Sequence, residues 1–176
     1  MQFFFFGLLR DREVLELVLG RPVSGWPLPS ARLPDHRLVR LRGDNFPLLV
    51  AAPGGSVEGI LVEGLGREEL ARLHFFESVE YAPRAVRVQD SSGAWLDAQV
   101  FGATGRAAAD GADWRFENWL ARHKARGLHE TALWLALYGH LEPAEADRRW
   151  DEARAEGRAL EELVREVSGK RFEPIS

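Results

Sequence analysis

The sequence predicts an α+β domain, built on a compact mixed β-sheet or small barrel, with a helical extension at the C-terminus. Three observations lead to this prediction. Residues 3–6 read FFFF, a short continuous apolar run that is typical of a strand buried on both faces. Further apolar runs follow, separated by glycine-containing turns and one helical pattern, without a regular strand–helix alternation. Beyond residue 113 the composition changes, and four of the six tryptophans lie there.

The overall composition narrows the possible functions. The chain has 176 residues, 45% of them hydrophobic and 28% charged, which fits one globular domain with a sizeable core. A formal net charge of -4 argues against a nucleic-acid partner. Because cysteine is absent, disulfides and thiol chemistry are excluded, and we expect a cytoplasmic protein. The N-terminal apolar run is too short to span a membrane and lacks the basic start of a signal peptide, so no membrane partner is expected.

The first strand leads into a short helix and then into an irregular connection. Gly7 ends the FFFF strand, Asp11 is placed to cap the helix that follows, and Gly20 is placed to stop that helix. The apolar stripe of the helix consists of Val14, Leu15 and Val18. Residues 21–35 contain four prolines, which predicts a segment without regular structure.

The middle of the chain predicts a meander, a helix and a hairpin. The runs HRLVRL and FPLLVAA are typical of strands, and a turn at Gly54 and Gly55 separates the second run from a third strand through Ile60 and Val62. A short helix is expected over residues 67–76. The runs RAVRVQ and WLDAQVFGA, joined by the turn DSSG, predict a hairpin.

The C-terminal tail, residues 113–170, predicts a helical extension packed on the sheet. Asp113 is placed to cap its first helix, Gly127 to kink that helix and Gly139 to end it, and Pro143 suits the first turn of the next helix. The tail is rich in large aromatic side chains that need a surface to cover: Trp114, Trp119, Trp134 and Trp150. The sequence leaves open whether the tail covers a cavity, extends the core or forms a homodimer contact.

Glu77 stands where the helical pattern calls for an apolar residue. The positions with the spacing of one buried stripe are Leu70, Leu73, His74 and Glu77. Desolvation disfavours an ionised carboxylate, so burial raises its pKa and makes it a better proton acceptor. The alternative is that the helix ends near Phe76, and that Glu77 is solvated or paired with Arg72 or Arg84.

The turn FGLLR after the first strand is a second candidate for chemistry. A strand that ends in glycine and runs into a helix exposes backbone N–H groups, which can hold a carboxylate or stabilise an oxyanion. Strand–glycine–helix junctions are also common structural connections, so the turn alone predicts no function.

Four ordered motifs resemble the γ-glutamylcyclotransferase-like family, in its avirulence-induced-gene-like branch. That family opens with a strand and a Tyr-Gly-x-Leu turn, and this chain has FFGLL there. The family continues with a Tyr-Pro or Phe-Pro strand, a Val-x-Gly-x-Leu strand, and a helix ending Leu-Asp-x-Phe-Glu-Gly-x-x-Tyr. The corresponding segments here are NFPLLV, VEGILVEG and LHFFESVEY. With the closing VFGA, the resemblance covers residues 3–103.

The resemblance implies a fold and a reaction. Residues 1–105 are expected to form the γ-glutamylcyclotransferase-like domain. In the family reaction, the α-amino group of a γ-glutamyl amide closes a five-membered ring on the γ-carbonyl, which releases 5-oxoproline and an amine. Glu77 corresponds to the catalytic acid/base, and no cofactor is implied. The residues that correspond to substrate-binding positions are Phe6, Gly7, Leu8, Leu9, Phe46 and Tyr81.

The chain departs from the family pattern around this site. Phe6 replaces a tyrosine and Leu8 a frequent serine or threonine, so two hydroxyl groups are missing. His74 replaces an aspartate, Ser78 replaces a glycine, and Pro83 stands where an arginine is often found. The pocket is therefore expected to be more apolar, which argues against glutathione or a free γ-glutamyl amino acid as the substrate.

Three classes of function remain after these observations. The first is a cyclotransferase-like enzyme that acts on a small-molecule γ-glutamyl amide. The second is a non-catalytic binding protein that kept the cavity, which Phe6 and Leu8 motivate. The third is a scaffold whose partner binds the aromatic tail. No metal site is predicted, because the five histidines lack metal-ligand spacing, and no G-x-S-x-G elbow indicates a nucleophilic serine.

Overall fold

The computed structural model describes residues 1–105 and 108–175, and its centre is a barrel of five strands. Around the barrel the strand order is β1–β5–β4–β2–β3, and β3 closes the circle by pairing with β1. The β1–β5 pair is parallel and the other pairs are antiparallel, so the sheet is mixed. The strands are β1 (Gln2–Phe5), β2 (Ser30–Leu41), β3 (Pro47–Glu63), β4 (Tyr81–Asp90), β5 (Trp95–Ala103) and, on the outer end of β2, β6 (Ala109–Asp113).

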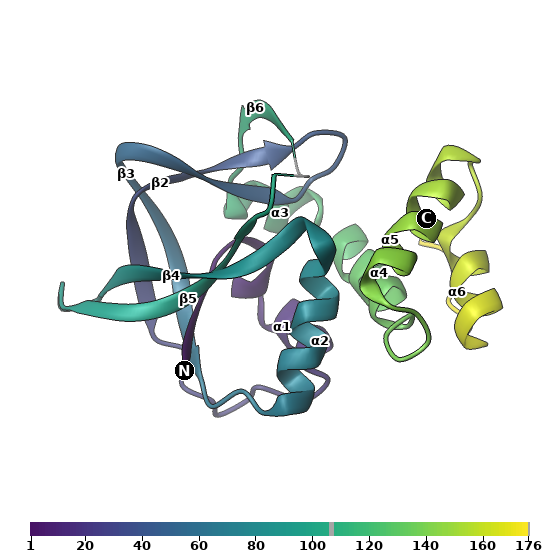
Figure 1. Cartoon of the computed structure of the whole chain (residues 1–176), viewed down its shortest axis with the longest axis horizontal. Helices are drawn as coiled ribbons and strands as arrows, with labels where there is room; N and C mark the ends of the chain where they lie inside the picture. Colours follow the sequence, from purple (N-terminus) through teal and green to yellow (C-terminus); the bar gives the residue numbers. More distant parts are fainter. Residues whose placement is uncertain (106–107, 176) are drawn as a thin grey trace.

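By their order along the chain, the helices outside the barrel fall into two groups. The barrel-side group is η1 (Gly7–Arg10), α1 (Arg12–Leu19), α2 (Arg67–Glu77) and η2 (Ser78–Glu80). The C-terminal group is α3 (Phe116–Arg122), α4 (Lys124–Leu135), α5 (Pro143–Ala155) and α6 (Leu160–Ser168). Figure 1 shows α2 between the barrel strands and the group α4–α6. The α+β class predicted from the sequence, with a small mixed barrel and C-terminal helices, is confirmed.

Strand β1 has one side in each of the two apolar cores. Phe4 packs inside the barrel with Leu33, Leu49 and Val100. Phe3 and Phe5 point the other way, into the larger core that the helices form with the outer face of the barrel. Because successive side chains on a strand alternate between faces, a run of four aromatics fits a strand that is buried on both sides.

The larger core also contains side chains from the C-terminal helices. Trp119 of α3 and Leu133 of α4 are buried in it together with Leu15 of α1 and Leu73 of α2. The Trp134 indole Nε1 donates a hydrogen bond to the carbonyl oxygen of Phe75, 3.1 Å away. The C-terminal helices are therefore joined to the barrel-side helices by apolar packing and by a hydrogen bond.

The irregular segment predicted over 21–35 is shorter than expected. Strand β2 already begins at Ser30 and includes Pro34, so the prediction is wrong for residues 30–35. The register between β2 and β3 shifts between Pro34 and His36, and Asp35 there has a positive φ of 58°. A proline is tolerated at such a bulge because a bulge leaves backbone groups out of the ladder.

The predicted turn between two strands at Gly54 and Gly55 is a bulge within one strand. Strand β3 runs without reversal from Pro47 to Glu63 and pairs with β2 on both sides of the bulge. The Asp35 carboxylate accepts a hydrogen bond from the backbone N–H of Gly54 at 2.8 Å. The two glycines bend the strand around the barrel and do not end it.

The first C-terminal helix also differs from the prediction. Asp113 belongs to β6 and caps no helix, and Arg115 is the N-cap of α3. The helical conformation is interrupted at His123, so α3 and α4 are separate helices, and Gly127 lies inside α4. A Cβ atom at Gly127 would lie 2.7 Å from the Trp119 ring, which explains the glycine as a close packing contact. Pro143 begins α5, as predicted.

Candidate active site

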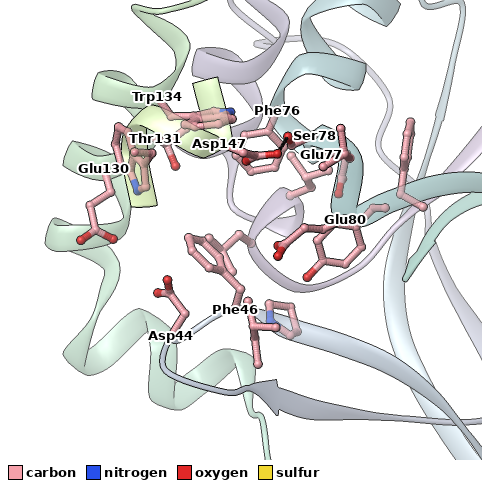
Figure 2. Close-up of a pocket in the computed structure, with 18 of the residues that line it drawn as sticks. Asp44, Phe46, Phe76, Glu77, Ser78, Glu80, Glu130, Thr131, Trp134 and Asp147 are labelled. Atoms are coloured by element: carbon pink, nitrogen blue, oxygen red, sulfur yellow. Dashed lines mark hydrogen bonds between the residues drawn. The ribbon is translucent and has the colours of Figure 1, made fainter. Parts of the chain in front are cut away.

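A cavity of about 670 Å³ lies between the barrel and the C-terminal helices (Figure 2). One wall comes from the end of β1, the η1 turn and the end of α2, and the other comes from α4 and α5. We call these the barrel wall and the helical wall. Barrel-wall residues are Phe5, Phe6, Leu8, Leu9, Phe76, Glu77, Ser78, Glu80 and Tyr81. Helical-wall residues are Glu130, Thr131, Trp134, Asp147, Trp150, Asp151 and Arg154, and the β2–β3 loop adds Asp44 and Phe46.

The turn after β1 is shaped by Gly7. Its φ is +61°, and a Cβ atom at this position would lie 2.4 Å from Cγ of Pro47, so only glycine fits. Phe6 is the N-cap of η1, and no side chain caps it with a hydrogen bond. Phe6, Leu8 and Leu9 line the cavity, whereas Gly7 lies behind them and sets the path of the backbone. The turn thus brings apolar side chains and the amino end of a helical turn to the barrel wall.

Glu77 is the last residue of α2 and lines the same cavity. Burial raises the pKa of its carboxyl group from the ordinary value to about 8. Within residues 1–105 and 108–175, the Glu77 side chain forms no hydrogen bond and no ion pair. Arg72, one possible partner, instead donates to the carbonyl oxygens of Leu17 and Val18 at 2.7 and 2.9 Å, and Arg84 is exposed. The carboxyl group is therefore available to a molecule in the cavity.

The buried stripe predicted for α2 is partly wrong. His74 is exposed and is not among the cavity-lining residues, and its ring contacts the edge of Phe101. The fully buried residues of α2 are Leu73 and Phe75. Phe75 packs against Trp134 and Tyr138 of the C-terminal segment, with ring centroids 5.3 and 5.5 Å away. The sequence pattern of α2 alone does not contain these partners.

The residue after Glu77 has an unusual backbone conformation. Ser78 has a φ of 54° and a ψ of -155°, close to a region that is essentially restricted to glycine. A conformation of this kind costs on the order of 1–3 kcal/mol for other residues. The Ser78 hydroxyl donates a hydrogen bond to the Asp147 carboxylate of α5, drawn as a dashed line in Figure 2.

The helical wall and the neighbouring loop are rich in carboxylates. Those that line the cavity besides Glu77 are Asp44, Glu80, Glu130, Asp147 and Asp151. Arg154 pairs with Asp44 at 2.7 Å and Arg126 pairs with Glu130 at 2.8 Å, and Arg42 also lines the cavity, so the carboxylates are only partly neutralised. The pKa of Glu80 is raised by burial and by the charges of Asp147, Asp151 and Asp44. The cavity therefore carries an excess of negative charge that favours a cationic ligand.

The remaining sequence-predicted site residues also reach this cavity. Phe46 lies in the loop between β2 and β3, and Tyr81 begins β4. The pKa of Tyr81 is raised by burial and by the nearby carboxylates of Glu77 and Glu80. The structure thus brings Phe6, Leu8, Leu9, Phe46, Tyr81 and Glu77 together around one cavity, with Gly7 in the turn behind.

Sequence reasoning missed the residues of the helical wall. Asp147 is 69 residues away from Ser78 along the chain, and no motif links the two. The one available signal is the tryptophan-rich composition of the tail, since Trp134 and Trp150 both line the cavity. Of the roles left open for the tail, both covering a cavity and extending the core agree with this geometry.

Two features are absent from the described part of the chain, a metal-binding cluster and a membrane-spanning helix. Residues 1–105 and 108–175 contain no group of three or more histidine, cysteine, aspartate or glutamate side chains that could hold a metal ion. None of the helices described is both long enough and apolar enough to cross a membrane.

The chain is similar in sequence and in fold to known proteins. The chain is 32% identical over 124 residues to AIG2-like protein D of Arabidopsis thaliana, covering 68% of this chain and 79% of that protein. A solution structure of another Arabidopsis thaliana protein is 26% identical, with a TM-score of 0.54 over 73% of this chain and 86% of that chain. A structure titled gamma-glutamyl cyclotransferase is 16% identical, with a TM-score of 0.50 over 62% of this chain and 69% of that chain, and shows the same fold.

Residues 3–121 match the family described as "Gamma-glutamyl cyclotransferase, AIG2-like". The match covers most of the chain and runs from β1 through nearly all of α3, so it includes the whole barrel, the Gly7 turn and Glu77. Helices α4, α5 and α6 lie outside it. The chain belongs to the AIG2-like gamma-glutamyl cyclotransferase family.

Proposed function

We propose that this protein is a cyclotransferase that releases 5-oxoproline from a small γ-glutamyl amide, with Glu77 as general acid and base. The observation that supports this most strongly is a carboxyl group with a pKa of about 8 on the wall of a cavity, without a protein partner in the described residues. A group with such a pKa can both accept and donate a proton near neutral pH.

The reaction needs little from the protein beyond positioning and proton transfer. The α-amino nitrogen of the γ-glutamyl group attacks the γ-carbonyl carbon, so a C–N bond of the ring forms and the amide C–N bond breaks. Glu77 takes one proton from the α-ammonium group before attack and delivers it to the leaving nitrogen as the amide C–N bond breaks. The ring nitrogen, which becomes the N–H of 5-oxoproline, then loses its surplus proton to the Glu77 carboxylate, from which it passes to the released amine or to water. Holding the chain bent supplies much of the rate, because the attack is intramolecular.

The charge of the cavity suits this substrate class. The α-ammonium group is a cation, and the carboxylates of the cavity favour it over an anion. A bound ammonium next to Glu77 also lowers the pKa of that carboxyl, which helps it to ionise as the substrate arrives. We assign binding of the α-carboxylate or of the transition-state oxyanion to the backbone N–H groups at the amino end of η1, which no side chain caps.

The test is an assay of 5-oxoproline release from a panel of γ-glutamyl amides with neutral, cationic and anionic leaving amines. We expect release by the wild type with at least one substrate, and a loss of about a hundredfold to ten-thousandfold in Glu77→Gln. Equal rates in the two proteins would contradict the proposed role of Glu77.

A second candidate function is small-molecule binding without turnover. Phe6 and Leu8 favour it, because both line the cavity as apolar side chains where hydroxyl groups are common in the family pattern. In this case, compounds of the same panel bind to the wild type and raise its thermal unfolding midpoint, but no 5-oxoproline is released.

A further inference from the structure

The conformation of Ser78 depends on contacts from outside its own segment. Glu77 has ordinary helical angles, with φ -73° and ψ -19°, and the chain then changes direction sharply at Ser78 with φ 54° and ψ -155°. Glycine reaches this region easily, whereas a residue with a Cβ atom does not. If Ser78 relaxed, the backbone carrying Glu77 and Glu80 would rotate, so the direction of both carboxyl groups is coupled to Ser78.

Hydrogen bonds from two sides hold this segment. From the barrel side, the N–H of Ser78 caps α2 by donating to the carbonyls of His74 and Phe75, and the Thr104 hydroxyl donates to the carbonyls of Val79 and Glu80. From the opposite side, the Ser78 hydroxyl donates to the Asp147 carboxylate. The Asp147 contact is the one that involves the side chain of the strained residue.

Asp147 is itself held in place by the packing of α5. One turn further along this helix, Trp150 packs edge-on against Trp134, with ring centroids 5.2 Å apart. Trp134 in turn donates to the Phe75 carbonyl, two residues before Glu77. Two hydrogen bonds therefore tie α4 and α5 to the end of α2, and Asp147 reaches Ser78 from a fixed position (Figure 2).

We propose that Asp147 is a positioning residue for Glu77, because it holds the Ser78 hydroxyl and keeps Ser78 in the conformation that turns Glu77 toward the cavity. The inference rests on the proposed function and extends it to the helical wall, which lies outside the family match. The α4–α6 segment thereby becomes part of the active site. A chain with glycine at position 78 would not need this hydrogen bond.

Substitutions at both ends of the hydrogen bond test this proposal. Ser78→Ala keeps the Cβ atom and removes the hydroxyl, and Asp147→Ala removes the acceptor. We expect each to lower kcat for 5-oxoproline release by roughly tenfold to a hundredfold with little change in KM, because a small misplacement of a catalytic group has effects of this size. Asp147→Asn keeps an acceptor oxygen and should retain kcat within about threefold of the wild type.

Glycine at position 78 provides the decisive comparison. Ser78→Gly removes the steric conflict together with the hydroxyl, so we expect kcat close to that of the wild type. In the Ser78→Gly background, Asp147→Ala should cause no further loss. Glu152→Ala removes a carboxylate from an exposed part of α5 and is the matched control, expected to leave kcat unchanged. Loss of kcat in Ser78→Gly equal to that in Ser78→Ala would overturn the proposal.

A second readout does not depend on turnover. The titration of the Glu77 carboxyl can be followed by carbon-13 NMR, with its signal assigned by its absence in Glu77→Gln. Tyr81 interacts with Glu77 directly, and the other charged or titratable groups that line the same cavity are Arg42, Asp44, Glu80, Glu130, Asp147, Asp151 and Arg154. Asp147→Asn therefore controls for the loss of one charge in the cavity. We expect Ser78→Ala to shift the midpoint toward that of an exposed glutamate, and Ser78→Gly to leave it near the wild-type value.

The two readouts separate the possible failures. If the wild type releases no 5-oxoproline from any substrate, the proposed function fails, and the carboxyl titration still tests the positioning role. If the wild type is active but Ser78→Ala and Asp147→Ala change neither kcat nor the Glu77 midpoint, the positioning role is wrong while the function stands. Thermal unfolding of each variant establishes that the compared proteins are folded.

Discussion

The two walls of the cavity differ in chemistry and in origin. The barrel wall is mostly apolar, with Phe6, Leu8 and Leu9 near the carboxyl groups of Glu77 and Glu80 at and just after the end of α2. The helical wall combines carboxylates with two tryptophans, and α4 and α5 lie outside the family match. The barrel wall thus contains the groups that we propose for the ring-closing reaction. The helical wall contributes further carboxylates, and its Asp147 and Trp134 side chains form hydrogen bonds to the end of α2 and the residue after it.

The largest effect is expected from a change that distorts the barrel wall. Gly7→Ala places a Cβ atom 2.4 Å from Pro47 at a positive φ, so we expect a loss of about 2–4 kcal/mol in the free energy of unfolding and at least about a hundredfold lower activity. Denaturant unfolding and the release assay measure the two effects. Gly64→Ala is the matched control, because its φ of +75° is similar but no atom lies within 4 Å. A comparable loss in both variants would show that the close approach to Pro47 does not matter.

A second prediction uses the buried acid of the barrel wall as a probe of stability. The pKa of Glu77 is raised to about 8 in the folded protein, from an ordinary value of 4.5. The folded state therefore binds this proton more tightly than the unfolded state, and the stabilisation is complete below about pH 4.5 and is lost as the pH rises through 8. Glu77→Gln does not titrate at position 77, so it should gain stability relative to the wild type by up to about 4 kcal/mol between pH 5 and pH 9, most of it between pH 5 and pH 8. If the free energies of unfolding of the wild type and Glu77→Gln change in the same way with pH, the Glu77 carboxyl group is exposed in the folded protein.

The helical wall should control substrate charge. Its carboxylates favour a leaving amine that carries a second positive charge, so the γ-glutamyl conjugate of a linear diamine should have a kcat/KM about tenfold above that of the conjugate of an alkylamine of the same length. Added salt should reduce the difference, because screening weakens interactions of partly exposed charges. The double substitution Glu130→Gln and Asp151→Asn should also reduce the difference in kcat/KM between the two substrates. A preference for the neutral substrate would assign selectivity to the apolar barrel wall.

The smallest effect concerns the attachment of the helical wall. Trp134→Phe keeps an aromatic ring but removes the hydrogen bond to the Phe75 carbonyl, and we expect a loss of about 1 kcal/mol in the free energy of unfolding. Trp95→Phe is the control, because Trp95 is half exposed, and its replacement should be nearly neutral. If the two substitutions have equal effects in denaturant unfolding, the indole hydrogen bond contributes nothing.

Local sequence patterns predicted the parts of the fold that depend on local chemistry. The FFFF run gave β1, the helix expected over 67–76 is α2 from Arg67 to Glu77, and the hairpin around DSSG is β4 and β5. Asp11 caps α1 by accepting from the backbone N–H groups of Glu13 and Val14. Capping, alternation and turn chemistry involve residues a few positions apart, which is why a single sequence reveals them.

Distant pairing explains what the sequence did not predict. Strand β6 has the sequence ADGAD, without apolar alternation, and it is a strand because it pairs with Val39 and Leu41 of β2. Pro34 lies inside a strand because a bulge accommodates it. In the site, the position of Glu77 follows from its helix and from the family motif, whereas Asp147 and Arg154, which line the same cavity, come from α5 far along the chain. Their charges form no motif, so only the fold brings them to the cavity.

The structure of Glu77→Gln with an intact γ-glutamyl amide bound tests the central claim most directly. We predict that the α-amino nitrogen lies within hydrogen-bond distance, about 3 Å, of the side chain at position 77. The γ-carbonyl or the α-carboxylate should contact the backbone N–H groups at the start of η1, with the leaving amine directed toward α4 and α5. A substrate bound outside this cavity, or with its amino group turned away from position 77, would contradict the claim.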